Sequence, residues 1–310
     1  MIVYLARRAL MSLVTLWLII TLTFVLMHAV PGDPFISDAR VSPQVMSNLR
    51  AYYGLDQPLV VQYVRYLARL VRLDLGRSIK SEVRDINQMI AEGLPVSAVL
   101  GLEALLVAVT GGVSLGILAA LGHNRGLDYL AMGVAIVGIS VPSFILATLL
   151  IHVLAVRLEL LPVGTWGTWR HTVMPALALA LAPLAYVARL TRSSMLDELS
   201  QDYVKAALAR GLSRSRAILG HALRNALLPV VTILGPLTAA VLTGSFVIEN
   251  IFGIPGIGKI FVLSISDRDY PLILSGAVVY SVLLLTMNLL VDLVYGIVDP
   301  RIRLAGRPLR

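Results

Sequence analysis

Residues 202–229 read DYVKAALARGLSRSRAILGHALRNALLP, and the organisation of the whole chain follows from this stretch. It lies between two long apolar segments, yet it contains the basic residues Lys205, Arg210, Arg214, Arg216 and Arg224. A polar, basic segment of this length between two apolar ones indicates a surface element that meets either a partner or a charged interface.

The spacing of apolar residues predicts two short helices here. The first has residues at helical spacing, namely Leu196, Leu199, Tyr203, Ala206 and Ala207. Gly211 then supplies a C-terminal stop, and Ser213 is a candidate N-cap for the second helix. The second helix ends before Pro229 and has one apolar stripe, made of Ile218, Leu219, Ala222, Leu223, Ala226 and Leu227.

Two interpretations of this element are open on physical grounds. Small residues at Ala206, Ala207 and Gly211 would let a helix end approach a partner closely, which favours a docking element. A basic amphipathic helix that lies on anionic lipid would carry a similar pattern of charge.

The composition places the chain among polytopic membrane proteins. Hydrophobic residues make up 57% of the 310 residues and charged residues 14%, more apolar surface than a soluble domain of this length can bury. The chain has no cysteine, which excludes disulfides, thiolate nucleophiles and cysteine-based metal sites. The net charge of +8 lies mainly in loops beside apolar segments, so it does not indicate a nucleic-acid partner.

Six apolar segments predict six transmembrane helices in a single 1–310 membrane domain. The first, 9–30, follows Arg7 and Arg8 and reads as an uncleaved span. An outer loop region, 31–95, separates it from a core, 96–298, which contains the central loop 190–229 and precedes a tail, 299–310. The core spans are expected at 98–121, 130–156, 173–189, 230–248 and 272–298.

The charges of the connecting loops predict the orientation. Segments assumed to be inside carry Arg7 and Arg8, Arg125, the basic central loop, and the arginines of the 299–310 tail. The short outside loops carry Arg157 and Arg170, then Lys259 and Arg268, each set offset by acids, and the charges of the long outer loop are nearly balanced. By the positive-inside rule both termini and the central loop are cytoplasmic.

Several residue patterns within these segments predict local structure. Val60, Val64, Leu67 and Val71 form a helical apolar stripe, which predicts an amphipathic helix in the outer loop. Gly112-x-x-x-Gly116 favours close helix packing. Pro142 and Pro183 are expected to kink their spans.

Two ionisable residues within spans are candidate path or gate residues. Glu103 is expected toward the outer end of its span and Asp292 toward the inner end of the last. Ionisable side chains in spans are costly and usually face a cavity or a partner. A buried polar network between helices is an equally good interpretation of both.

No catalytic, metal or nucleotide site is expected in this chain. Residues 253–260, GIPGIGKI, satisfy G-x-x-x-x-G-K, but Ile260 stands where a phosphate-binding loop needs Ser or Thr for magnesium. The stretch also follows a membrane span and lies on the outside. The histidines are scattered without metal-ligand spacing, and no nucleophile and base stand together.

The central loop resembles the "EAA" loop in the membrane subunits of bacterial ATP-binding-cassette (ABC) importers. The matching residues are Ala206 and Ala207, Gly211 four positions later, and Leu228-Pro229; Lys205 replaces the usual Glu. Motifs over nearly the whole chain resemble the dipeptide/oligopeptide/nickel ABC permease family, and its B-type subunit in particular. They are RRAL…HAVPGDP (7–34), YGLDQPL…DLGRSI (53–79), SVPSF (140–144), FGIPGIGK…RDYP (252–271) and DLVYGIVDPRIR (292–303).

The resemblance implies the permease fold of a type I importer in the bacterial cytoplasmic membrane, with the central loop as a coupling helix. It also implies a C-type permease partner, two ABC ATPase subunits that carry ATP and magnesium, and an extracytoplasmic substrate-binding protein; the chain itself would need no cofactor. The implied ATPase contact consists of Ala206, Ala207, Gly211, Leu212 and Ser213, flanked by Arg214, Arg216 and His221 and braced by Asp202 and Tyr203.

The sequence does not identify the transported substrate. Di- or oligopeptides are the expected cargo, and import of nickel or another small solute is the alternative within the same mechanical class. An ion-driven secondary transporter would need ion-coupling carboxylates or inverted repeats, for which Glu103 and Asp292 are thin support.

Overall fold

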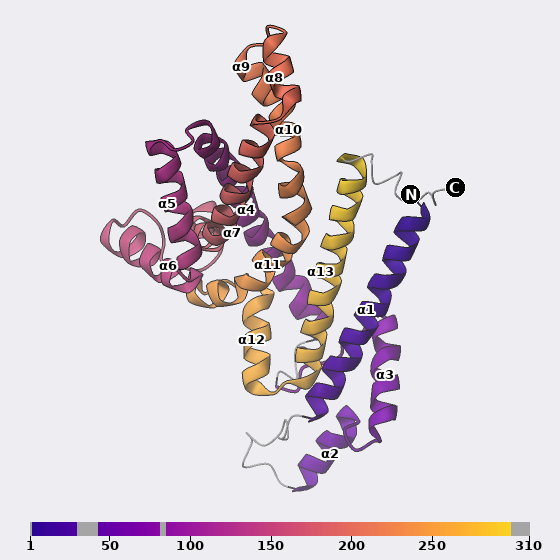
Figure 1. The fold of residues 1–310 in the computed structure, drawn as a ribbon. Coiled ribbons are helices and arrows are strands. Elements are labelled where there is room, and N and C mark those ends of the chain that lie inside the picture. Colours follow the sequence, from indigo (N-terminus) through magenta and orange to yellow (C-terminus); the bar gives the residue numbers. More distant parts are fainter. Residues whose placement is uncertain (1, 30–42, 81–84, 299–310) are drawn as a thin grey trace.

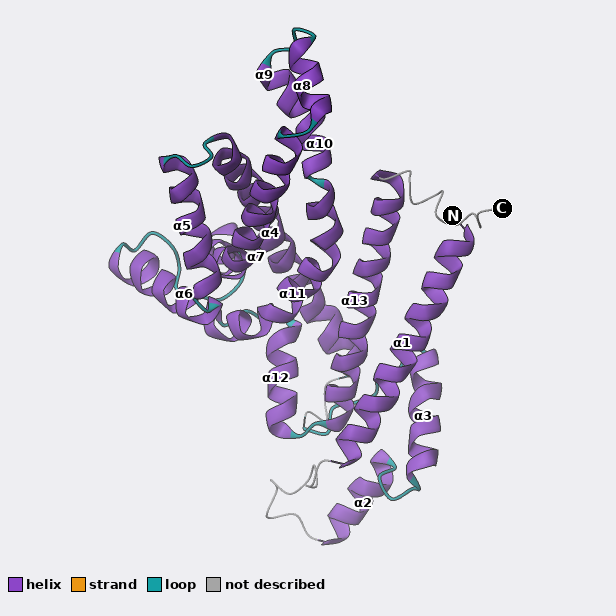
Figure 2. Cartoon of the chain, in the orientation of Figure 1, coloured by secondary structure: helices purple, strands orange, loops and turns teal. Residues whose placement is uncertain are grey.

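The computed structural model describes residues 2–29, 43–80 and 85–298, and this part of the chain is built from helices without a β-sheet (Figures 1 and 2). Among these described residues, five helices are long and apolar enough to cross a membrane. They are α1 (Ile2–Ala29), α4 (Ile86–Leu121), α7 (Trp169–Leu199), α11 (Leu228–Phe252) and α13 (Tyr270–Val298).

The third expected span is broken into two helices. α5 (Gly126–Ser140) meets α6 (Ser143–Leu150), which continues as the π-helical segment η1 (Ile151–Arg157), and the two arms are bent by 105°. Val141 is extended and Pro142 is the N-cap of the second arm, as expected because proline disfavours helical backbone in the residue before it. The described chain therefore has six spans if the bent pair counts as one.

Pro183 behaves differently from Pro142. α7 continues through both Pro175 and Pro183 and runs ten residues past the expected end of its span. α4 also begins earlier than expected, at Ile86, inside the region assigned to the outer loop. The Asp85 carboxylate caps it by accepting the Asn87 N–H at 3.0 Å.

The contact between α4 and α7 is the most extensive between two helices, and glycine makes it possible. A Cβ on Gly112 would lie 2.7 Å from the Leu184 carbonyl oxygen, and one on Gly116 would lie 2.6 Å from the Ala188 carbonyl oxygen. The expectation of close packing at these two glycines is confirmed. Gly138 brings α5 against the same helix, because its Cβ would lie 3.0 Å from the Leu181 carbonyl oxygen.

Short helices gather at the two ends of the long ones (Figure 1). At one end lie α2 (Pro43–Tyr53), α3 (Leu59–Val71) and α12 (Ile257–Asp267), which connects α11 to α13. At the other end α8 (Asp202–Ala209), α9 (Arg214–Ala217), η2 (Ile218–Ala222) and α10 (Leu223–Ala226) join α7 to α11.

The amphipathic helix expected in the outer loop is α3, and it packs beside α1. The Tyr63 hydroxyl lies 2.6 Å from Thr21 Oγ1, and Gln62 Oε1 lies 3.2 Å from His28 Nε2. Val60, Val64 and Val71 point away from the rest of the described chain and are exposed.

Replacing Gly116 with Ala should destabilise the protein, because the added methyl group meets Thr191 and backbone atoms of α7. Overpacking of this kind costs about 1–3 kcal/mol. Gly133 of α5 is the matched control, since nothing lies within 4 Å of its added Cβ. Thermal unfolding in detergent should show a lower midpoint for G116A and no decrease for G133A. Equal midpoints would contradict the close contact.

Candidate functional site

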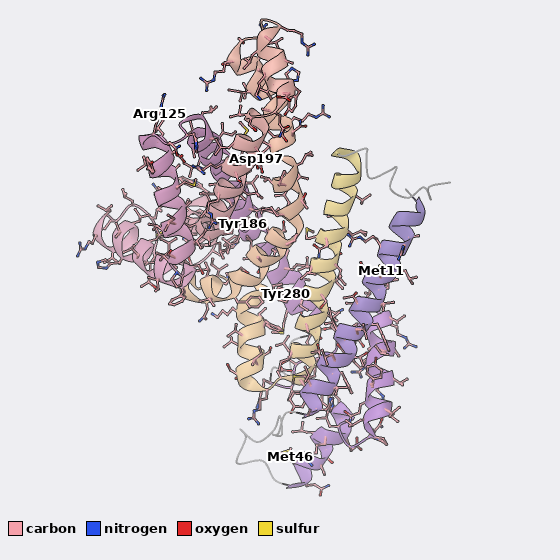
Figure 3. The ribbon with its side chains drawn as sticks, viewed as in Figure 1. Met11, Met46, Arg125, Tyr186, Asp197 and Tyr280 are labelled. Carbon is pink, nitrogen blue, oxygen red and sulfur yellow. The ribbon has the colours of Figure 1, made fainter. Side chains whose placement is uncertain are left out.

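Residues 202–226, which form α8, α9, η2 and α10, project beyond the ends of the long helices, and we call them the knob (Figures 1 and 3). The chain breaks its helix at Ser200 and Gln201 after α7, and it enters α11 at Leu228-Pro229 after α10. The knob is therefore held by the ends of two long helices.

An apolar cluster fixes the base of the knob to the membrane bundle. Met195 of α7, Ala120 of α4, and Ile218 and Ala226 of the knob are buried together. Within the knob, Val204 and Ala207 of α8 are buried as well. The knob is thus packed against α4 and α7, the two helices that form the centre of the fold.

The turn after α8 has the hydrogen bonds of a Schellman motif. The Leu212 N–H donates to the Ala207 carbonyl at 3.2 Å, and the Gly211 N–H donates to the Leu208 carbonyl at 2.9 Å. Gly211 has φ +88°, which L side chains rarely adopt. The expected helix stop at Gly211 is confirmed, and a backbone requirement explains the glycine there, since no atom lies within 4 Å of its Cβ position.

Tyr203 connects three elements at the base of the knob. Its hydroxyl donates to the Glu198 carboxylate of α7 and accepts the Asn225 amide N–H at 3.1 Å. Partial burial, together with the Glu198 carboxylate, raises the pKa of this hydroxyl, so it stays protonated and able to donate.

The knob brings the sequence-predicted coupling residues together on one projecting element. Ala207 is buried and Leu212 is half-buried. The exposed members are Asp202, Tyr203, Ala206, Gly211, Ser213, Arg214, Arg216 and His221. Lys205 pairs with Asp202 at 3.0 Å. Ser213 occupies the N-cap position of α9 without a side-chain capping bond.

The predicted apolar stripe of the second knob helix is wrong at Leu219. Ile218, Ala222 and Ala226 are buried as expected, but Leu219 is 64% exposed. The backbone of 218–222 is π-helical, and this wider turn changes which residues share a face.

The two candidate path residues are not brought together by any described contact. Glu103 lies near the middle of α4 rather than at its outer end; it is half-buried and has no hydrogen bond to a described residue. Asp292 belongs to α13, but its side chain lies outside the described residues.

A buried carboxylate of α11, Glu249, was missed by the sequence analysis and contacts the start of α12. Glu249 is fully buried; it accepts the Ser97 hydroxyl at 2.7 Å and the Gly258 N–H at 2.9 Å. Ser97 in turn accepts the Ile257 N–H at 3.0 Å. Backbone N–H groups of the GIPGIGKI stretch are thus bonded to the chain's own side chains. Glu249 lies one residue beyond the expected span 230–248, which is why it escaped notice.

A second buried carboxylate, Asp269, joins the outer loop to the start of α13. It accepts the Ser78 hydroxyl, the Ile79 N–H at 3.2 Å, the Lys80 N–H at 3.4 Å and the Leu272 N–H at 3.3 Å. The only sequence signal for this role was its place in the RDYP motif.

A third carboxylate ties the start of α5 to α7. The Arg192 guanidinium donates to both oxygens of Asp128, at 2.6 and 2.7 Å, and the Asn124 N–H donates to the same carboxylate at 2.9 Å. Such a bidentate pair fixes orientation as well as distance. The Asp128–Arg192 pair lies toward the same end of the molecule as the knob.

Comparison with known proteins identifies the family. The model of the binding-protein-dependent transport system inner membrane component matches residues 112–304, and the model of the N-terminal part of such components matches residues 1–87. The chain belongs to this family. It is a multi-pass component of a bacterial inner membrane by the family's description and by its apolar helices.

Relatives match over nearly the whole chain. The dipeptide transport system permease protein DppB of Bacillus subtilis is 52% identical over 97% of this chain and 98% of its own length. The oligopeptide transport system permease protein OppB of Escherichia coli K12 is 42% identical over 98% of this chain and all of its own. The expected resemblance to this permease family is therefore confirmed.

Solved structures confirm the fold class. The MetNI methionine ABC transporter has a chain that superposes with a TM-score of 0.57 at 14% identity, covering 68% of this chain and 97% of that one. An amino acid ABC transporter gives a TM-score of 0.53 at 20% identity, covering 67% and 93%. The chain has the all-α fold of an ABC importer permease.

Replacing Asp269 with Ala should loosen the outer loop of this family member. The change leaves the buried N–H groups of Ile79 and Leu272 without their acceptor, a cost of about 1–3 kcal/mol. We expect faster tryptic cleavage after Lys80 and a lower unfolding midpoint. Asp267→Ala, which removes an exposed carboxylate two residues away, should neither speed this cleavage nor lower the midpoint. Unaltered cleavage in D269A would show that the loop is held by other contacts.

Proposed function

We propose that this chain is the membrane permease subunit of an ATP-driven importer that moves di- or oligopeptides across the bacterial cytoplasmic membrane. The close relatives named for dipeptide and oligopeptide transport support peptides over nickel or another small solute as cargo. The observation that supports the mechanical part is the knob, a projection packed on the two central helices of the bundle.

The knob is the proposed docking site for the ATPases. Its exposed surface offers small residues, Ala206 and Gly211, beside the basic residues Arg214 and Arg216. A helix end of this kind fits into a cleft on a partner and is flanked by polar contacts. The buried Ala207 holds α8 close to α9 and η2, so it supports this surface without being part of it.

The proposed driving force is mechanical. The chain is inferred to need no cofactor and to have no catalytic site, while ATP and magnesium are bound by the partner ATPases. Closure of the ATPases would displace the knob, and the apolar cluster at its base would pass that displacement to α4 and α7. Coupling of this kind requires an element with two arrangements that both partners bias.

The two remaining proposed partners are the substrate-binding protein and a second permease. With both termini and the knob in the cytoplasm, α2, α3 and α12 lie on the outer side, where a substrate-binding protein would dock. A related C-type permease completes the translocation path. The exposed apolar side chains of α1, such as Leu10, Leu13 and Leu22, suit contact with lipid or with that second permease.

Copurification tests the docking site. We expect Ala206→Trp to abolish copurification of the ATPase subunits, because an indole group at this exposed position keeps the knob out of a closely fitting cleft. Gly211→Trp should do the same, but it also strains the turn at φ +88°, so the Ala206 variant is the decisive one. Gly126→Trp, at an open glycine at the start of α5, is the matched control. Membrane insertion is checked by fractionation. Variants that retain their ATPases would place the contact elsewhere on the chain.

Uptake by the complete transporter in proteoliposomes tests the cargo and the energy source. ATP-dependent accumulation of a labelled dipeptide, abolished when the ATPases are omitted, is the expected result. Accumulation of nickel instead of peptide would favour the alternative cargo. Uptake driven by an ion gradient without ATPases would refute the proposed importer altogether.

A further inference from the structure

A cavity of about 610 Å³ lies beside α12. α12 lies toward the end of the molecule remote from the knob (Figure 1). The first turns of α4, the segment around Ser78, and α12 with its flanking turns line the cavity. Its volume falls within the range of about 300–1,000 Å³ that is typical of small-ligand sites.

The lining combines apolar side chains with charges of both signs. Val96, Ile260, Leu263 and Leu272 contribute apolar surface. Lys80 and Lys259 are the basic lining residues, and the acidic ones are Glu92, Asp267 and Asp269, the last of which is already bonded to the outer loop. A ligand that suits this lining has an apolar body and carries both a positive and a negative group.

Lys259 and Asp267 are placed where helix stability disfavours them. Lys259 lies in the first turn of α12, and Asp267 is the last residue of that helix. A helix favours acids at its N-terminus and bases at its C-terminus, so both charges oppose the α12 dipole. Both side chains are exposed, and neither has an ion-pair partner among the described residues. The stability of α12 therefore does not account for either charge.

The separation of these two charges matches a short peptide. Eight residues of α-helix correspond to about 12 Å along the axis. An extended peptide spans about 3.5 Å per residue, so two to four residues cover about 7–14 Å between their charged ends. The flexible Lys259 side chain can accommodate the difference within this range.

We propose that this cavity is an entry subsite for short peptides, in which Lys259 binds the C-terminal carboxylate and Asp267 binds the N-terminal ammonium group. The subsite rests on the proposed peptide-import function and adds a selection step to it. It recognises the two charges that every unmodified peptide carries and accepts varied side chains along its apolar wall.

Uptake of end-blocked peptides by the complete transporter, supplied with its binding protein, tests this subsite. Lys259→Gln should lower uptake of a free-carboxylate tripeptide by about fivefold, the equivalent of a partly exposed ion pair, and leave uptake of its C-terminal amide unchanged. Asp267→Asn should do the same for free against N-acetylated peptide. Arg268→Gln, which removes an adjacent charge outside the lining, should change neither.

An equal loss for free and blocked peptides in K259Q would overturn the subsite, because it would mean that Lys259 serves docking of the binding protein or the second permease. No loss at all would also overturn it. If the wild type takes up no peptide, the proposed function fails instead, so the two failures are distinguishable.

A second measurement avoids selection of peptides by the binding protein. The chain has no cysteine, so Leu263→Cys introduces a single thiol into this chain at the cavity wall. In the assembled complex without binding protein, millimolar tripeptide should slow alkylation of this thiol by N-ethylmaleimide, and adding K259Q should remove the effect. Protection that is absent, or equal in both backgrounds, would contradict the proposal.

Discussion

The close approach of α4 to α7 is the contact on which the rest of the structure depends. In a bilayer the lipid tails are as apolar as the helices, so association relies on tight packing and not on the exclusion of water. Gly112 and Gly116 allow the two backbones to meet, and Gly138 lets α5 approach α7 as well. The knob packs on the ends of the same two helices through Met195 and Ala120.

Near the ends of the bundle, buried carboxylates join neighbouring elements through hydrogen bonds. Each of them joins separate elements: Asp128 joins α5 to α7, Glu249 of α11 joins α4 to α12, and Asp269 joins the outer loop to α13. A carboxylate that accepts several N–H and O–H donors satisfies them together, and its removal leaves them all unpaired. Polar networks thus add to the apolar packing that positions α5, α12 and the outer loop.

Local patterns in the sequence were sufficient to predict much of the fold and of the knob. Apolar length predicted the long helices, and Gly211 predicted the end of α8, because only the backbone of the turn is involved. Pro142 predicted a break, but the 105° angle depends on how α5 and α6 pack against α7. The Glu249–Ser97 and Asp269–Ile79 bonds join residues 152 and 190 positions apart, which no local pattern records. Leu219 was misplaced because a π-helical turn has no clear signature in the sequence.

The uninterrupted course of α7 has a consequence for how the two sides of the membrane communicate. A helix of 31 residues is about 46 Å long, and a tilt of about 5° around its centre moves each end by about 2 Å in opposite directions. Helix shifts of about 1–2 Å are the size that switches packed interfaces between discrete arrangements. Pro175 and Pro183 do not end the helix, so Leu199 and Trp169 lie on one continuous helix. A tilt of α7 as a unit would move both ends without a relay of side-chain rearrangements.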